Sequence, residues 1–303
     1  MESKPGLWMF PSSCPHLHRT PSCRRLIIRP TAPSASLYVA SLIAARINAF
    51  SPTAERPFVL GLPTGSSPLL IYKYLVAFHR EGKLSFKHVI TFNMDEYIGI
   101  PRDHPQSYHT FMYTHLFSHI DILPENAHLL DPSAADLEAE AERYEAAIAA
   151  AGGIRLFLAG VGADGHIAFN EPGSSLSSRT RVKTLANDTI VDNARFFDGD
   201  VDSVPKTALT VGVGTIMDAK EVVVIATGSN KARAVRDGIE GSIGHLCTIS
   251  ALQMHRNAIV VVDEEATAEL RVKTVKYFKQ IEEAAEKMPG DHHRLGKGLE
   301  AKL

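Results

Sequence analysis

Short apolar runs alternate with segments of helical periodicity along most of this 303-residue chain, and this alternation constrains the fold more than any other feature. The run at 58–62, Phe-Val-Leu-Gly-Leu, is too short for a helix and apolar throughout, as in a strand buried on both faces. Further strands are expected at 25–29, 88–94, 154–159, 222–226 and 258–262. Helices are expected at 34–50, 68–80 and 136–151, with another after Ser229.

Strands that alternate with helices predict an α/β fold: one doubly wound, mainly parallel, Rossmann-like sheet with helices on both faces, in a single domain. Ligands bind such sheets outside the carboxyl ends of the strands. Four polar residues each follow an expected strand, and we expect them to meet at that edge. They are Thr64, Asp95, Asp164 and Lys231.

The chain divides by composition into three parts. Residues 1–24 are rich in Pro, Ser, His and Arg without sustained periodicity, which predicts a disordered extension; a transit peptide is the alternative, because the segment holds a single acid. Residues 25–280 contain no linker or internal repeat and are the expected folded domain. Residues 281–303 are charged and are expected to form a tail.

Charge and cysteine content disfavour several classes of protein. Lys plus Arg number 32 and Asp plus Glu 34, a net charge of -2, so no strong overall field attracts nucleic acid or an anionic membrane. No apolar run approaches the roughly 18 residues of a membrane span. The three cysteines show no paired spacing, so no metal site is expected, and a reducing, cytoplasmic compartment is the simplest interpretation.

The first motif, Gly61 to Pro68, places a strand, a glycine turn and a helix start in succession. Backbone N–H groups and the helix dipole at such an N-terminus favour an anion, and Thr64, Ser66 and Ser67 add hydroxyl donors. The motif fits neither GxGxxG nor a P-loop, so dinucleotide and ATP binding are not indicated. The alternative is a simple turn with serines as helix N-caps.

The second motif, Asn93 to Tyr97, holds two adjacent acids where a buried strand is expected to end. Adjacent side chains point to opposite sides of an extended chain, so only one of Asp95 and Glu96 is expected to face a ligand. Such a carboxylate is suited to proton transfer. The alternative is a solvated turn.

The third motif, Gly160 to Pro172, sets His166 between two acids, Asp164 and Glu171. Carboxylate neighbours can select one tautomer of a histidine and raise its basicity, which suits a general base for a sugar hydroxyl. A buried structural histidine is the alternative. A metal site is less favoured, because a single histidine lacks clear ligand spacing.

A fourth set is basic: Arg179, Arg181, Lys183, Arg195 and Lys231. Lys231 stands at the start of an expected helix, where it can meet an anion at the helix N-terminus. Residues 174–183 mix serines with cations, as phosphate sites often do. The alternative for each of these residues is a solvated surface position.

Taken together, four segments closely resemble the glucosamine-6-phosphate isomerase/deaminase family: 61–68, 92–97, 164–172 and 178–183. The likeness extends from about Arg25 to Phe278 and includes 195–198, 208–214 and 272–278. It weakens at 244–247, where the family carries Asn and Trp in place of Gly244 and Cys247. Local packing is expected to differ there, but not the chemistry.

The resemblance implies conversion of glucosamine 6-phosphate and water to fructose 6-phosphate and ammonia, in amino-sugar catabolism and without a cofactor. His166 would open the sugar ring, held by Asp164 and Glu171. Asp95 would move a proton from C2 to C1, and hydrolysis of the resulting imine would release ammonia. The substrate phosphate would be held by Thr64, Gly65, Ser66, Ser67, Arg195 and Lys231.

The resemblance also implies regulation and assembly. Five residues match an effector phosphate site of allosteric family members: Ser174, Arg181, Lys183, Thr184 and Tyr277. Because other residues already serve the substrate phosphate, these five indicate a second ligand, N-acetylglucosamine 6-phosphate. It would bind between subunits of a homo-oligomer, which in this family is often a hexamer. The alternative is that the five residues make only intersubunit contacts.

Two other functions stay open. A 6-phosphogluconolactonase has a similar Asp-Gly-His segment, but a lactone hydrolase would not require Asn170-Glu171-Pro172 or Asp95 in its Asn-Met-Asp-Glu-Tyr setting. A catalytically silent sugar-phosphate sensor would be expected to lack catalytic residues, and all of those proposed are present. The missing dinucleotide fingerprint disfavours a nicotinamide dehydrogenase.

Overall fold

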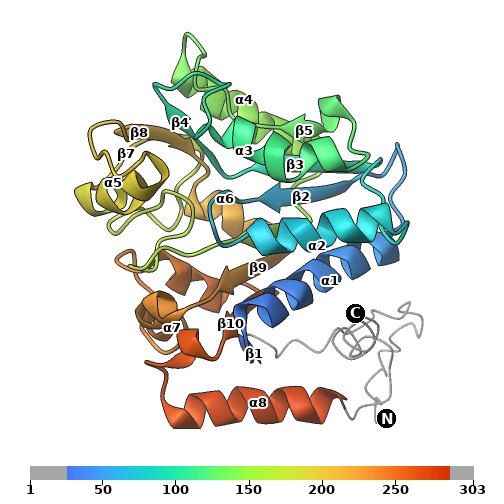
Figure 1. Cartoon of the computed structure of the whole chain (residues 1–303), viewed down its shortest axis with the longest axis vertical. Helices are drawn as coiled ribbons and strands as arrows, with labels where there is room; N and C mark the ends of the chain where they lie inside the picture. Colours follow the sequence, from blue (N-terminus) through green and yellow to red (C-terminus); the bar gives the residue numbers. More distant parts are fainter. Residues whose placement is uncertain (1–25, 287–303) are drawn as a thin grey trace, which may run out of the picture.

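The computed structural model describes residues 26–286, and its core is a parallel seven-stranded sheet with helices on both faces (Figure 1). The strands are β1 (Leu26–Arg29), β2 (Phe58–Leu62), β3 (Val89–Asn93), β5 (Ala127–His128), β6 (Leu156–Ala159), β9 (Glu221–Ala226) and β10 (Ala258–Asp263). Their order is β1-β10-β9-β6-β2-β3-β5, and every neighbouring pair is parallel. The predicted fold class is confirmed.

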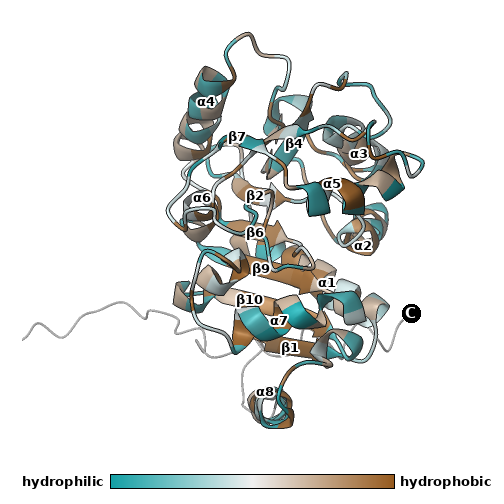
Figure 2. Ribbon diagram, turned by 90° about the vertical axis from the view of Figure 1, so that its left-hand side faces the viewer, coloured by the Kyte–Doolittle hydropathy of each residue, from teal (hydrophilic) through white to brown (hydrophobic). Residues whose placement is uncertain are grey.

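The apolar side chains of these strands alternate between two cores, one on each face of the sheet. In β9, Val222 and Val224 belong to one core, and Val223 and Ile225 to the other. A strand buried on both faces is apolar at every position, which explains the continuous runs in the sequence. Figure 2 shows these hydrophobic strands enclosed between helices.

The helices divide between the two faces. On one face lie α1 (Ala32–Phe50), α2 (Leu69–Arg80) and α3 (Tyr108–His115). On the other lie α4 (Leu137–Ala150), α6 (Val213–Met217) and α7 (Ala232–Ile239). The described residues also form short 3-10 helices: η1 (Phe117–His119), η2 (Pro124–Asn126), η3 (Ala194–Phe196), η4 (Ser229–Lys231), η5 (Thr248–Met254) and η6 (Glu265–Thr267).

The order of the strands reverses beside β2. From β2 the chain builds outward through β3 to β5, whereas β6, β9 and β10 are added on the other side of β2. The loops after β2 and β6 therefore diverge, and they leave a crevice at the carboxyl ends of these two strands. The first sequence motif, 61–68, continues from the end of β2 into the loop that follows it, and the third motif, 160–172, begins directly after β6.

A second sheet, antiparallel and three-stranded, was not predicted. It consists of β4 (Asp95–Ile98), β8 (Thr207–Thr210) and β7 (Arg181–Thr184), in the order β4-β8-β7. Along the chain, β7 leads into the helix α5 (Asn187–Asn193). The strand expected at 88–94 ends at Asn93, because Met94 joins the two sheets. Its N–H donates to the carbonyl of Leu62 in β2, and its carbonyl accepts the N–H of Val211.

The last described helix, α8 (Val272–Glu286), lies outside β1 (Figure 1). An ion pair between Arg29 and Glu282, with 2.7 Å between Nη2 and Oε1, attaches it there. The helix continues across the boundary expected at residue 280. The predictions for 1–24 and for most of the tail lie outside the described residues. Nowhere in 26–286 is a helix long and apolar enough to cross a membrane.

Candidate active site

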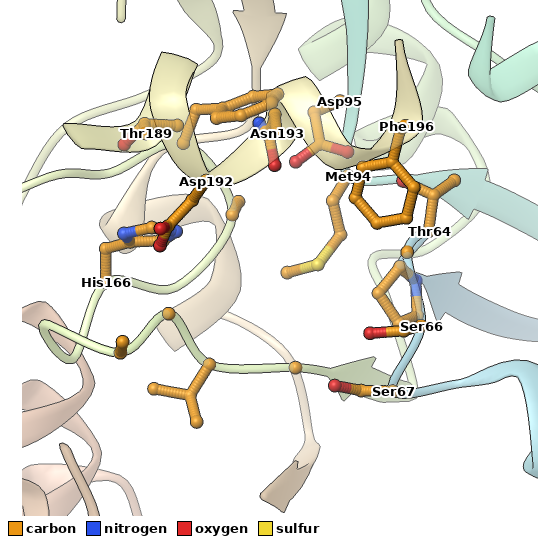
Figure 3. Close-up of a pocket in the computed structure, with 18 of the residues that line it drawn as sticks. Thr64, Ser66, Ser67, Met94, Asp95, His166, Thr189, Asp192, Asn193 and Phe196 are labelled. Carbon is orange, nitrogen blue, oxygen red and sulfur yellow. The ribbon is translucent and has the colours of Figure 1, made fainter. Parts of the chain in front are cut away.

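A pocket opens at the crevice beside β2 and β6 (Figure 3). Its walls come from the segments that follow β2, β3, β6 and β9 and from the α5 region, so residues far apart in the sequence meet here. Among the predicted site residues, the pocket is lined by Thr64, Gly65, Ser66, Ser67, Asp95, His166, Arg195 and Lys231. The candidate base, the histidine and the candidate phosphate ligands therefore surround one cavity.

Asp95 is the buried carboxylate of this pocket. The residue is 7% exposed, and burial, followed by the negative charge of Glu96, raises its pKa to about 8. Figure 3 shows its carboxylate beside Met94 in the wall of the cavity. A carboxylate with so high a pKa is a much stronger base, once ionised, than a solvated aspartate.

Glu96, the second acid of the motif, has a structural role. Its carboxylate accepts hydrogen bonds from the N–H groups of Tyr97, Tyr108 and His109 at 2.8–2.9 Å. Two of these donors lie in the first turn of α3, where N–H groups have no partner within the helix. Only Asp95 of the two acids lines the pocket, as expected for adjacent residues in a strand.

His166 lies in another wall of the pocket and is paired with Asp164. Nδ1 of His166 is 2.7 Å from Oδ1 of Asp164, and the same oxygen accepts the backbone N–H of His166 at 3.1 Å. Burial raises the pKa of Asp164, but the hydrogen bond and charge of His166 outweigh it and lower the pKa below its ordinary value. The ionised aspartate favours a proton on Nδ1, which leaves Nε2 to exchange protons with a ligand.

Glu171 contacts the backbone just before α5. It is buried, and its carboxylate accepts the N–H of Ala186 at 2.8 Å, immediately before α5. Because α5 contributes to the pocket wall, Glu171 anchors one end of that wall. Its role beside His166 stays a prediction. Among residues 26–286, no group of three His, Cys, Asp or Glu side chains could hold a metal ion.

The ring of His166 lies directly over Gly162. A β-carbon at position 162 would fall 2.3–2.6 Å from three ring atoms of His166, far inside van der Waals contact. The backbone N–H of Gly162 also donates to the carbonyl of His166 at 2.8 Å. Only glycine allows the ring to approach the backbone this closely.

The loop from Thr64 to Ser67 leads into α2, whose first turn has no side-chain cap. Gly65 has a φ of +93°, in the left-handed region that glycine adopts without strain. The N–H of Leu69, the first residue of α2, donates to the backbone carbonyl of Ser66 at 3.4 Å, and the part of this segment that lines the pocket is the loop itself. This geometry favours the anion-binding interpretation of the motif over serines that serve as N-caps.

Two cations reach the pocket from different elements. Arg195 comes from η3, with its guanidinium carbon 4.8 Å from the centre of the Phe196 ring. Lys231 comes from η4, which follows β9. Burial, and then the neighbouring charge of Arg195, lower the pKa of Lys231. An anion bound between the two would relieve their repulsion, so the pair is suited to a phosphate.

Sequence reasoning missed several side chains that line the pocket from α3, α5 and η3. They are Tyr108, Thr189, Asp192, Asn193 and Phe196. The last four are spaced like one face of a helix, a signal that the sequence does carry. The amide of Asn193 donates to the hydroxyl of Tyr97 at 2.9 Å, which ties α5 to β4.

The predicted effector residues do not all meet within one chain. Arg181 and Lys183 share one half-buried face of β7, while Thr184 lies on the opposite, exposed face. Ser174 is buried. Tyr277 lies on α8, which Figure 1 and Figure 2 both place at the far end of the molecule from β7.

The fold and the pocket define a class: α/β proteins with a pocket at a switch point, in which cations lie beside groups able to transfer protons. Comparison with known families narrows this class. The family described as glucosamine-6-phosphate isomerases/6-phosphogluconolactonase matches residues 30–261, and the chain belongs to this family.

Individual relatives divide between two activities. The glucosamine-6-phosphate deaminase of Phocaeicola vulgatus is 61% identical over 260 residues, which cover 86% of this chain and 99% of that protein. A solved monomeric glucosamine-6-phosphate deaminase is 41% identical, with a TM-score of 0.75 over 82% of this chain and 100% of that one. A 6-phosphogluconolactonase from Trypanosoma cruzi, 20% identical with a TM-score of 0.65 over 84% of this chain and 99% of that one, shows the shared fold alone.

Proposed function

We propose that this chain is an enzyme that converts glucosamine 6-phosphate and water to fructose 6-phosphate and ammonia, in amino-sugar catabolism. The observation that carries the proposal is one pocket that holds both the buried Asp95 carboxylate and the His166 ring paired with Asp164. The Phocaeicola vulgatus relative bears the name of this activity. Cys247, within the described residues, is a free cysteine, which suits a cytoplasmic enzyme.

Ring opening is assigned to His166. Nε2 takes the proton of the anomeric hydroxyl and returns a proton to the ring oxygen, which breaks the bond between C1 and that oxygen and leaves an aldehyde at C1. Asp164, whose oxygen lies 2.7 Å from Nδ1, stabilises the imidazolium that forms between these two transfers. The pair thus supplies both a base and an acid from one side chain.

Gly162→Ala is expected to displace the His166 ring and to lower turnover by about 10- to 100-fold, since small misplacements of a catalytic group cost this much. Gly244→Ala is the matched control, because a β-carbon at position 244 meets nothing within 4 Å. Steady-state kinetics and thermal melting of both variants make the comparison. Wild-type turnover in Gly162→Ala would show that the ring does not need this close approach.

Isomerisation is assigned to Asp95. Its carboxylate removes the proton from C2 while a proton of the substrate's 2-ammonium group passes to the aldehyde oxygen, which gives an enolamine with a hydroxyl at C1. Asp95 then delivers its proton to C1, which leaves an iminium at C2. Water then adds to C2 and ammonia departs, so that a ketone remains. The 2-ammonium group of the bound substrate is an opposite charge, and it lowers the pKa of Asp95 from about 8. Substrate binding therefore helps to ionise the base.

The 6-phosphate is assigned to the loop Thr64–Ser67, to Arg195 and to Lys231. The loop lines the pocket with residues whose hydroxyls can donate hydrogen bonds, and the two cations neutralise the charge. No step in this scheme requires a cofactor, because the C1 carbonyl of the substrate accepts the electron pair that remains when the C2 proton is removed.

The experiment that tests the proposal measures ammonia and fructose 6-phosphate from glucosamine 6-phosphate, in parallel with hydrolysis of 6-phosphogluconolactone. We expect both products in equal amounts and no hydrolysis of the lactone. Hydrolysis of the lactone without ammonia would assign the chain to the lactonases of its family. Binding of the amino sugar phosphate without turnover would favour the sensor.

We further propose that N-acetylglucosamine 6-phosphate is an activating effector, held by Ser174, Arg181, Lys183 and Thr184 of one subunit and Tyr277 of another. The guanidinium of Arg181 is half-buried and, within the described residues, donates only to uncharged oxygens. Tyr277 lies far from β7 in its own chain, so the site requires a homo-oligomer, with a hexamer expected. Because one solved relative is monomeric, the first quantity to measure is the mass of this protein in solution, which gives its oligomeric state.

Saturation curves with and without this effector, in the wild type and in Lys183→Ala, measure the coupling. We expect the effector to lower the half-saturating substrate concentration by roughly 5-fold or more, and Lys183→Ala to lose this response. A hyperbolic saturation curve that the effector does not change would contradict the effector site and favour the alternative, in which the five residues make only contacts between subunits. A monomer by sedimentation would exclude the intersubunit site.

A further inference from the structure

One buried side chain, Asn170, holds the turn that follows His166. Its amide nitrogen donates to the carbonyl of Ile167 at 2.9 Å and to that of Val211 at 2.8 Å. Thr248 closes the turn, because its hydroxyl donates to the Asn170 carbonyl at 2.8 Å and accepts the Ile167 N–H at 3.2 Å. Asn170 is 0% exposed, so water does not replace these contacts.

The turn is held in a conformation that it would not adopt freely. Ala168, between Ile167 and Asn170, has a φ of +52°, a left-handed value that costs energy for a residue with a side chain. Such a turn relaxes when its contacts are lost. Because His166 immediately precedes it, the position of the ring depends on the same contacts.

Arg181 in β7 is the hydrogen-bond donor for the side-chain oxygen of Asn170. Its Nη1 donates to Asn170 Oδ1 at 3.0 Å. A guanidinium can only donate, so it requires the amide oxygen at this position and the amide nitrogen toward the two carbonyls. Without Arg181, the one partner that Oδ1 keeps among residues 26–286 is the hydroxyl of Ser178, at 3.5 Å. An acceptor left so weakly paired favours rearrangement of the side chain.

We propose that Asn170 is a positioning residue for His166, and that Arg181 holds Asn170 in the orientation that the turn requires. The hydrogen bonds from Arg181 to Asn170 and from Asn170 to Ile167 form a physical link from β7 to the catalytic histidine. The inference rests on the proposed function of His166 in ring opening. It gives Arg181 a task in the catalytic domain that does not depend on an effector.

Arg181→Met removes the donor while keeping an unbranched, though shorter, side chain. Without effector, kcat is expected to fall about 10-fold while KM stays close to the wild-type value, because the substrate contacts are intact. Arg179→Met is the matched control. Arg179 lies two residues away, pairs on the surface with Asp218, and contributes only its backbone carbonyl near Arg181.

A double variant separates positioning from an independent effect. If Arg181 acts through His166, adding Arg181→Met to His166→Gln should cost nothing further, since the group that it positions is already gone. Losses that multiply in the double variant would overturn the proposal. An equal loss in Arg179→Met would overturn it as well, because any change in the segment would then have the same effect.

Nitrogen NMR of histidine-labelled protein gives a readout that needs no turnover. The ring signals of His166, among 14 histidines, are assigned by their loss in His166→Gln. We expect Arg181→Met to shift or broaden these signals and Arg179→Met to leave them unchanged. Unchanged His166 signals in Arg181→Met would reject the link, even if the wild type proved not to deaminate glucosamine 6-phosphate.

Discussion

Replacement of Asp95 with asparagine is expected to lower ammonia release by about 10²–10⁴-fold, the usual loss when a general base is removed. Asparagine fills the same space but cannot take the C2 proton. In the wild type, kcat/KM should rise with pH through about 8, the pKa of Asp95 in the free protein, because only the ionised carboxylate is a base. A pH series of initial rates in both proteins measures the two effects.

The same substitution is expected to stabilise the fold at alkaline pH. The pKa of Asp95 rises from 3.8 to about 8, so the folded chain holds a proton that the unfolded chain releases between these values. Wild-type stability from this group is greatest below the lower pKa and is lost as pH rises through the upper one. At about 1.4 kcal/mol per pKa unit, the shift of about four units corresponds to roughly 6 kcal/mol, so Asp95→Asn should gain several kcal/mol of stability above pH 8.

Urea unfolding of the wild type and of Asp95→Asn, at acid and at alkaline pH, tests this gain in stability.

Glu96→Gln is the control for the loss of ammonia release in Asp95→Asn. Glutamine keeps one oxygen for the N–H groups of α3 and removes the charge that helps to raise the pKa of Asp95. We expect this variant to retain turnover above pH 8, with the acid limb of its profile displaced to lower pH. Loss of activity in Glu96→Gln with retention in Asp95→Asn would reverse the roles of the two acids.

Replacement of His166 with glutamine is expected to slow turnover of the cyclic substrate by about 10²–10⁴-fold, because glutamine cannot carry a proton from the anomeric hydroxyl to the ring oxygen. The affinity for 2-amino-2-deoxyglucitol 6-phosphate, a linear analogue with no ring to open, should stay near the wild-type value. Kinetics and calorimetry of the purified variant measure the two quantities.

The matched control for this substitution is His119→Gln in η1, where the histidine is exposed and lies outside the pocket. It should retain wild-type turnover and affinity. If His166→Gln weakens binding of the linear analogue as much as it slows turnover, the residue serves substrate binding and not ring opening.

The main sheet could be predicted from the sequence because its strands are buried on both faces. In β9 and β10, consecutive apolar residues feed two cores, so an unbroken apolar run is the direct consequence of their position. Parallel strands also align their carboxyl ends, so residues that follow different strands meet at one edge. Thr64, Asp95 and Lys231 line one pocket for this reason, while their individual roles stay predictions.

The second sheet could not be predicted in the same way. Its strands are four residues long, and β7 reads Arg-Val-Lys-Thr, with every second residue exposed. β4 pairs with β8 although Asp95 and Thr210 are far apart in the sequence. Such short strands are specified by the partner that they meet, which local periodicity does not reveal.

By itself, the sequence determined the α/β architecture, the edge at which the polar loops meet and the chemistry that those residues can support, because hydrophobicity and its periodicity are read directly along the chain. Only the tertiary structure decided that Asp95 faces the pocket while Glu96 caps α3, and that Glu171 binds Ala186. It also decided that Arg181 reaches Asn170. These arrangements depend on hydrogen-bond partners that only folding brings into contact, and the residue type alone does not predict which partner a side chain will meet.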